Sequence, residues 1–239
     1  QTASRRDADD PGNRADRMKK ERYFTTDSID VKARDMLRDI EGLKKHHVLL
    51  PASPHCALLV MDMQQYFLKE SSHAFVPSAP AIIPRISQLV EACAAKKLPI
   101  VFTRHQNTEA DAGMMSVWWR DLIRRGSSSW EITSMLDTSQ AIVIDKSQYD
   151  AFHRTELETL LRDKGIRQVI VCGVMTHLCC ETTARSAFVR GFEVFIAIDG
   201  TATYSEPLHR ATLWNAAHGF AVPMLVEEFV AVLAPQFAG

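Results

Sequence analysis

The sequence predicts an α/β fold of three layers, Rossmann-like, in which helices cover both faces of a mostly parallel sheet of five or six strands. Two observations predict it. Short runs of aliphatic and β-branched residues are typical of strands buried on both faces, and segments with the apolar spacing of helices lie between those runs. Regular alternation of this kind implies right-handed βαβ units and hence a parallel sheet.

The elements can be assigned in chain order from residue 56 onward. Strands are expected in CALLVMD, LPIVFTRH, QAIVIDK, RQVIVCGV and FEVFIAIDG, and PMLVEE is a candidate sixth strand. Helices are expected over 79–97, 113–125, 155–165, 180–190 and 206–218. Because no internal repeat or linker interrupts this pattern, residues 55–239 are expected to form one domain.

Two further segments precede that domain. Residues 1–20 are rich in charge and carry no aliphatic pattern, which predicts a disordered tail. Residues 21–54 are expected to form a helical extension, because TTDSIDVKARDMLRDIEGLKK begins with helix-capping residue types and continues with apolar residues at helical spacing. The apolar face consists of Ile29, Ala33, Met36, Leu37 and Ile40. This helix is expected to pack against another part of the protein.

Composition excludes several classes of function. The net charge of -1 over 239 residues supplies no long-range field, so we expect no nucleic-acid partner. Neither a run of about 20 apolar residues nor a signal-peptide core is present, which predicts no membrane partner. Five thinly spread cysteines argue against a disulfide framework and for reduced thiols in a cytoplasmic protein.

Three reactive side chains are expected at one edge of the sheet. Asp62 ends the first strand, Lys146 ends the third, and Cys179 follows the fourth at a helix start. Ligands of open parallel sheets bind outside the carboxyl ends of the strands. Each residue also has a structural interpretation, as a capping carboxylate, a solvated lysine or a buried thiol. Their joint placement favours chemistry, since a helix start and an ammonium lower a thiol pKa and a carboxylate can accept the proton.

Four motifs carry a resemblance to a known family. They are DMQQYF (62–67), DKSQYDAFHRTELETLL (145–161), CGVMTHLCCETTARSAF (172–188) and IDGTAT (198–203). In their order and spacing the chain resembles, over about residues 55–230, the isochorismatase-like cysteine hydrolases, which include nicotinamidases, carbamoyl-amide hydrolases and isochorismatases.

The resemblance implies catalytic roles for the three residues at the strand ends. Asp62, Lys146 and Cys179 match the family's catalytic triad, with the first cysteine of the pair as the nucleophile. The resemblance also implies a cis peptide between Val174 and Met175, and an oxyanion hole formed by the backbone N–H groups of Met175 and Cys179. The expected activity is hydrolysis of a small-molecule amide through a thioester, without a cofactor.

Other functions remain open alongside amide hydrolysis. Isochorismatases share DMQ-x-YF with this chain but typically carry glycine at the position of Cys179, so hydrolysis of a vinyl ether is the alternative. A non-catalytic binding relative is a second alternative, and a redox role for the Cys179–Cys180 pair is a third. Metal-binding nicotinamidases carry an Asp and histidines soon after the catalytic Asp. Here QYFLKESSHAF offers only His73, so we predict no metal and do not favour nicotinamide as substrate.

The expected substrate-binding side chains come from several segments. They are Gln64, Phe67, Tyr149, His177 and Trp118. Gln64 follows Asp62 by two residues, His177 matches a histidine of the isochorismatases, and the aromatic residues supply apolar surface. SVWWRDLIRR, which contains Trp118, is also typical of an interface helix. Since family members usually assemble, we expect a homodimer or homotetramer that acts on a small-molecule substrate.

Overall fold

A computed structural model describes residues 19–43, 54–119 and 121–234. These residues contain one six-stranded sheet in which every neighbouring pair is parallel, in the order β3-β2-β1-β4-β5-β6. The strands are β1 (Cys56–Met61), β2 (Ile100–His105), β3 (Ile142–Lys146), β4 (Gln168–Val174), β5 (Glu193–Ala202) and β6 (Val222–Met224). The predicted fold class is therefore confirmed, with six strands rather than five.

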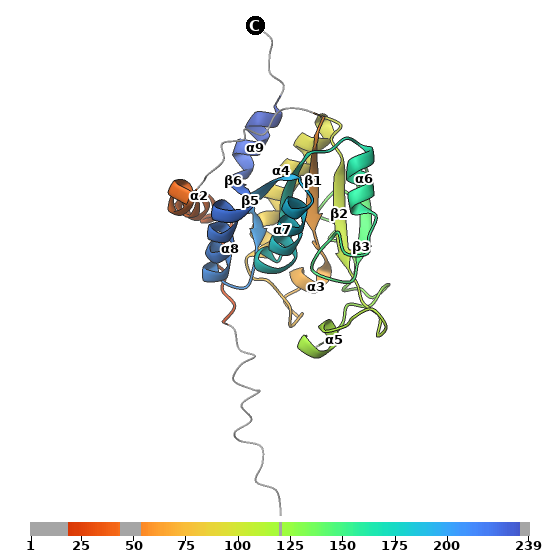
Figure 1. Cartoon of the computed structure of the whole chain (residues 1–239). Coiled ribbons are helices and arrows are strands. Elements are labelled where there is room, and N and C mark those ends of the chain that lie inside the picture. Colours follow the sequence, from red (N-terminus) through yellow and green to blue (C-terminus); the bar gives the residue numbers. More distant parts are fainter. Residues whose placement is uncertain (1–18, 44–53, 120, 235–239) are drawn as a thin grey trace, which may run out of the picture.

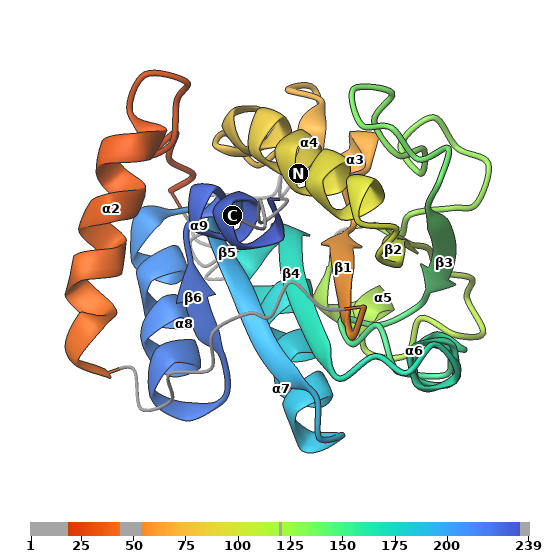
Figure 2. The same cartoon turned by 90° about the horizontal axis from the view of Figure 1, so that it is seen from above.

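Helices cover both faces of this sheet, as Figure 2 shows. One face carries α4 (Ala79–Ala95) and α9 (Val226–Leu233), and the other carries α6 (Leu157–Asp163), α7 (Glu181–Val189) and α8 (Glu206–Gly219). Two short helices, α3 (Gln65–Leu68) and α5 (Met115–Trp118), lie at the carboxyl edge of the strands, at the bottom of Figure 1. No helix among the described residues has the length and apolar character needed to cross a bilayer.

The N-terminal extension contains α2 (Ile29–Ile40), followed by the short 3-10 turn η1 (Glu41–Leu43). In Figure 2, α2 lies alongside α8 at one end of the sheet. Four of its five expected apolar positions are buried and Leu37 is half-buried, as the helical spacing predicted. Most of the predicted tail, residues 1–18, and residues 44–53 of the extension lie outside the described residues.

The expected helix over 113–125 was wrong in its length. Among the described residues of this range only α5 (Met115–Trp118) is helical, and residues 121–124 have no regular secondary structure. Tertiary contacts replace the helical hydrogen bonds there: the Ile123 carbonyl accepts the N–H of Asn107, and the Trp119 indole reaches across to Tyr149. The apolar spacing of this segment therefore does not mark one buried helix face.

The expected strand PMLVEE was also too long. β6 ends at Met224, and α9 begins at Val226. The carboxylate of Glu228 accepts the backbone N–H of Leu225 at 2.7 Å, which caps the start of the helix. The two glutamates of the motif thus lie in the first turn of a helix, where the helix dipole favours negative charge.

The order in which the chain adds strands to the sheet reverses between β1 and β4. The carboxyl ends of these two strands also approach each other closely. Gly173 in β4 has a φ of +106°, and a Cβ atom at this position would lie 2.2 Å from the carbonyl oxygen of Met61 in β1. Only glycine fits that space. This topological switch point is where ligands of doubly wound sheets bind.

Candidate active site

Asp62 lies directly after β1 in a left-handed backbone conformation. Its φ is +48°, which is uncommon for a residue other than glycine, and its side chain is fully buried. The hydroxyl of Thr103 on β2 donates to Oδ1 at 2.6 Å and also accepts the backbone N–H of Asp62 at 3.2 Å. Thr103 therefore fixes both the backbone and one carboxylate oxygen of Asp62.

Lys146 ends β3 and points its ammonium at the other oxygen of that carboxylate. Its Nζ lies 2.8 Å from Oδ2 of Asp62, 3.3 Å from Sγ of Cys179 and 2.9 Å from the carbonyl oxygen of Gln148. These three contacts match the three protons of an ammonium. The structure thus brings the acid, the base and the thiol predicted from three strand ends into one cluster.

Cys179 lies in η2 (Thr176–Cys180), a five-residue π-helical turn between β4 and α7. The peptide bond between Val174 and Met175, which precedes this turn, is cis. Cys179 is 5% exposed, whereas Cys180 is fully buried with its sulfur directed at the carbonyl oxygen of Cys172. The first thiol of the pair therefore faces the lysine, and the second is part of the core.

The protonation states follow from burial and charge. Burial is the largest contribution and favours the neutral forms. The mutual attraction of Lys146 and Asp62, together with the hydrogen bonds and other charges around them, outweighs it, so the pKa of Lys146 is raised and that of Asp62 is lowered. Burial, and next the charge of Asp62, raise the pKa of Cys179 despite the nearby ammonium. This contradicts the expectation of a lowered thiol pKa. At neutral pH the cluster contains an ammonium, a carboxylate and a protonated thiol.

Gln64, expected to bind substrate, is instead used to join backbone segments. It is fully buried, its Nε2 donates to the carbonyl oxygens of His105 and Trp130, and its Oε1 accepts the N–H of His105. The Gln64 amide therefore ties the end of β2 to the backbone at Trp130.

The aromatic residues divide into those near the cluster and those away from it. Phe67 is buried. Trp118 is 72% exposed, while its neighbour Trp119 donates its indole N–H to the hydroxyl of Tyr149 at 2.7 Å. Tyr149 is half-buried, and burial raises its pKa. Of the two tryptophans, Trp119 rather than Trp118 is thus hydrogen-bonded to Tyr149.

His177 lies in η2, two residues before the thiol. The ring is partly buried, its Nδ1 is 2.6 Å from the hydroxyl oxygen of Thr203 after β5, and burial lowers its pKa. This placement next to Cys179 is compatible with the predicted contact to substrate.

Sequence reasoning missed Thr103 and His105, both of which lie near the end of β2. His105 is buried, and its Nε2 lies 2.7 Å from Oδ1 of Asn107. Burial, assisted by the charge of Lys146, lowers its pKa to about 4, so the ring is neutral. A histidine at a strand end, in LPIVFTRH, was the available signal.

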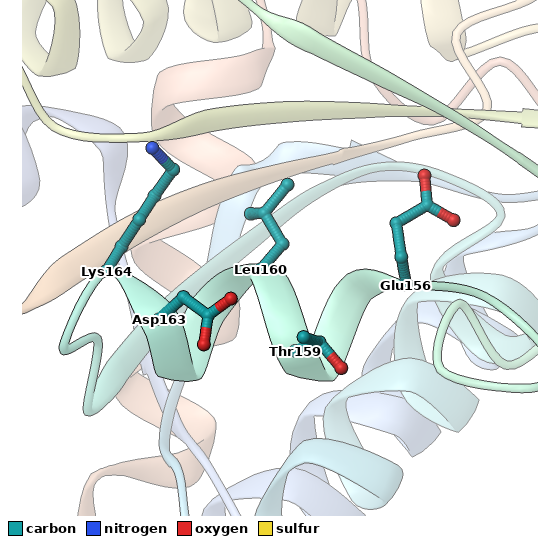
Figure 3. A pocket seen from close by; sticks show the side chains of 5 residues that line it. All are labelled: Glu156, Thr159, Leu160, Asp163 and Lys164. Carbon is teal, nitrogen blue, oxygen red and sulfur yellow. The ribbon is translucent and has the colours of Figure 1, made fainter.

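Two other features of the described residues, groups of possible metal ligands and a surface depression, do not indicate a different site. Within the described ranges, no three His, Cys, Asp or Glu side chains are grouped to hold a metal ion. Figure 3 shows a depression along α6. It is lined by Glu156, Thr159, Leu160, Asp163 and Lys164. It contains none of the cluster residues, so we assign the candidate site by the convergence of Asp62, Lys146 and Cys179.

The fold and this cluster define an α/β enzyme with a candidate cysteine nucleophile at the switch point of its sheet. The chain belongs to the isochorismatase family: the model of the Isochorismatase domain matches residues 56–228. It is 41% identical over 176 residues to Nicotinamidase 3 of Arabidopsis thaliana, covering 72% of this chain and 85% of that protein. It is 30% identical to Enterobactin synthase component B of Escherichia coli K12, of which it spans 64%, with 75% of this chain aligned.

Solved structures agree with this assignment. A cysteine hydrolase from Pseudomonas syringae pv. phaseolicola superposes with a TM-score of 0.75 at 28% identity, covering 79% of this chain and 97% of that one. The pyrazinamidase of Pyrococcus horikoshii in complex with zinc superposes with a TM-score of 0.65 at 26% identity, covering 72% and 99%. The predicted family and fold are confirmed, and with them the prediction of a hydrolytic enzyme.

Proposed function

We propose that the protein hydrolyses a small-molecule amide, with Cys179 as nucleophile, Asp62 as general base and acid, and Lys146 as the cation that holds both. The observation that carries this proposal is the position of the Lys146 ammonium, 2.8 Å from the Asp62 carboxylate and 3.3 Å from the Cys179 sulfur. Relatives named nicotinamidase, ureidoacrylate amidohydrolase and N-carbamoylsarcosine amidase support the amide class.

The resting charges suggest how the nucleophile forms. Asp62 is a carboxylate and the Cys179 thiol is protonated, so proton transfer to Asp62 accompanies attack of the sulfur on the amide carbonyl. Lys146 stays positive and stabilises the thiolate as it forms. Backbone N–H groups of Met175 and Cys179 would stabilise the oxyanion, a contribution of about 2.7 to 4 kcal/mol per donor in other enzymes.

The remaining steps return the proton and release the acid. Protonated Asp62 gives its proton to the departing ammonia or amine, which leaves a thioester on Cys179. Water that gives a proton to Asp62 then attacks the thioester carbonyl, the carboxylic acid leaves, and the proton returns to the sulfur. General acid-base assistance of this kind contributes about 10²- to 10⁴-fold in rate.

Tyr149, Trp119 and His177 are the side chains we propose at the substrate. Tyr149 and Trp119 form one hydrogen-bonded aromatic unit, and His177 lies on the turn that carries the nucleophile. The zinc present in the pyrazinamidase structure has no counterpart ligand set among the described residues, so no step is assigned to a metal. The cytoplasmic location and the homodimer or homotetramer remain predictions.

Ammonia release from a panel of amides tests this function. Nicotinamide, pyrazinamide, N-carbamoylsarcosine and ureidoacrylate represent the relatives' chemistry, and Nicotinamidase 3 makes nicotinamide the first to be assayed. We expect ammonia from at least one amide with the wild-type protein and none above background with Cys179→Ala. Pyruvate release from isochorismate, unaffected by Cys179→Ala, would instead support the vinyl-ether alternative.

A further inference from the structure

Residues 19–24, which are separated from α2 by four residues, lie against the carboxyl side of the sheet. We call residues 19–24 the N-terminal arm. The N–H of Glu21 donates to the carbonyl oxygen of Tyr204 at 2.7 Å, and the N–H of Phe24 donates to the hydroxyl of Ser78 at 3.1 Å. The arm therefore joins the segment after β5 to the start of α4. Because the family match begins at residue 56, the arm lies outside the matched domain.

Tyr23 is the residue of the arm that enters the core. It is 4% exposed, its hydroxyl oxygen accepts the backbone N–H of Thr203 at 2.9 Å, and the same oxygen lies 2.8 Å from Nδ1 of His209. In the tautomer of His209 that carries its proton on Nε2, the Tyr23 hydroxyl donates its single proton to Nδ1. Burial lowers the pKa of His209 to about 3 and raises that of Tyr23, so both stay neutral at physiological pH.

Thr203 connects this pair to the candidate site. Its backbone N–H is held by Tyr23, and its hydroxyl oxygen lies 2.6 Å from Nδ1 of His177. Thr203 is fully buried, so few other positions are open to it. His177 lies between Met175 and Cys179, the residues whose backbone N–H groups would form the oxyanion hole. The arm and the candidate site are thus joined through one buried threonine.

We propose that Tyr23 is a positioning residue: its hydroxyl holds Thr203 and, through Thr203, the ring of His177. The N-terminal arm then completes the support of a site whose reactive residues all lie in the family domain. The effect on substrate binding rests on the function proposed above. The link from Tyr23 to His177 is a matter of geometry and can be tested without substrate.

Tyr23→Phe is the variant that isolates the hydroxyl. It keeps the ring in the core and leaves the Thr203 N–H without its acceptor. Met36→Ala is the control, because Met36 is a buried core residue of α2 and its truncation lowers stability without removing a hydrogen bond of this chain. Both variants are made in the full chain.

The first readout is nuclear magnetic resonance of the histidine rings. With histidine labelled by ¹³C, the His177 signal is assigned by its loss in His177→Gln, and its pKa is measured by titration. Glu181 on α7 and His209 on α8 are the titratable groups that act on His177. We expect the His177 pKa to rise by about half a unit or more in Tyr23→Phe, toward its ordinary value, and to change by less than about 0.2 in Met36→Ala.

The second readout is steady-state kinetics with the fastest amide of the panel. We expect KM to rise about fivefold in Tyr23→Phe with kcat within about twofold, and no further rise when Tyr23→Phe is added to His177→Gln. An unchanged His177 titration in Tyr23→Phe, or an equal shift in Met36→Ala, would overturn the proposal. If no amide is hydrolysed, the proposed function fails, while the resonance measurement still decides the link to Tyr23.

Discussion

The ammonium of Lys146 lies 2.8 Å from Oδ2 of Asp62, although β2 separates the strands that carry the two residues. Neighbouring strands lie about 4.8 Å apart, so the lysine stem must extend across the end of β2 to make this contact. Both side chains are fully buried. A buried ion pair is weak evidence for stability, because desolvation opposes its attraction, but perturbed groups grouped at a strand edge are typical of active sites.

Removing the ammonium is expected to cost both activity and stability. Lys146→Met should lower kcat/KM at least about 10³-fold, since neither the carboxylate nor the developing thiolate keeps its cation. It should also destabilise the fold by about 3–5 kcal/mol, because the Asp62 charge stays buried without a partner. Urea unfolding and ammonia release measure the two effects.

Two variants control this prediction. Lys164→Met removes an exposed lysine at the end of α6 and should leave both quantities unchanged. The double variant Asp62→Asn/Lys146→Met should be more stable than Lys146→Met, since it removes the uncompensated charge. Equal stability of the double and the single variant would contradict the buried pair.

Replacing each of the two adjacent cysteines by serine is expected to affect kcat very differently. Cys179→Ser should lower kcat at least about 10³-fold, because the less acidic hydroxyl is a poor substitute for the nucleophile. Cys180→Ser should retain kcat within about threefold, since its sulfur is directed at the Cys172 carbonyl and not at Lys146. Comparable losses in the two variants would favour a role for the pair, as in redox chemistry.

Thr103→Val is expected to shift the pH dependence. The Thr103 hydroxyl donates to Oδ1 of Asp62 and so stabilises the carboxylate, the charged form. Its loss raises the pKa of Asp62, and activity is then lost at a higher pH as the solution is acidified. We expect the acid limb of kcat/KM to move up by about 0.5 to 1 pH unit. A limb that stays in place would show that Asp62 does not control it.

The adjacent tryptophans offer a matched test of the substrate surface. Trp119→Phe removes the donor to the Tyr149 hydroxyl and should raise KM several-fold, about the effect of one hydrogen bond. Trp118→Phe alters a side chain that is 72% exposed and should leave KM within about twofold. A larger rise in KM for Trp118→Phe than for Trp119→Phe would instead support Trp118 as the substrate-binding residue, as predicted from the sequence.

Acid is expected to destabilise the protein through two buried histidines. His105 and His209 have pKa values of about 4 and about 3 in the folded state, against about 6.5 when unfolded. Between about pH 6 and 4 the unfolded chain therefore binds protons that the folded chain does not, and the free energy of unfolding falls as pH falls. Two such groups contribute up to about 2.7 kcal/mol per pH unit.

His209→Gln provides the check on this slope. Urea unfolding at a series of pH values should give a dependence smaller by up to about 1.4 kcal/mol per pH unit than in the wild type, whatever the change in absolute stability. An unchanged slope would mean that His209 is not the group that takes up the proton.

The sequence was sufficient to predict the sheet and the convergence of Asp62, Lys146 and Cys179, for a physical reason. Parallel strands buried on both faces need continuous apolar runs, and polar residues that end such runs stand out. Asp62, Lys146 and Cys179 were found in this way. The prediction of a helix over 113–125 was wrong because the indole of Trp119 and the carbonyl of Ile123 form hydrogen bonds with residues distant in the sequence. Local apolar spacing gives no sign of such contacts.

The protonation states of the site residues, and the hydrogen bonds that hold these residues in place, could not be predicted from the sequence. A thiol at a helix start suggests a lowered pKa, but burial beside the Asp62 carboxylate raises that of Cys179. The contribution of Tyr23 also depends on tertiary structure, since it lies 180 residues before Thr203. Gln64 resembles a substrate ligand in the sequence, whereas in the structure its amide group is hydrogen-bonded to the backbone of His105 and Trp130.

Alkylation of Cys179 by iodoacetamide as a function of pH tests the central claim most directly and needs no substrate. If Asp62 takes the thiol proton inside the cluster, the labelling rate, mapped by peptide mass, should be nearly constant from pH 6 to 8.5 and should fall at least about tenfold in Asp62→Asn. A rate that rises about tenfold per pH unit, as for an ordinary thiol, and is the same in Asp62→Asn would contradict the account.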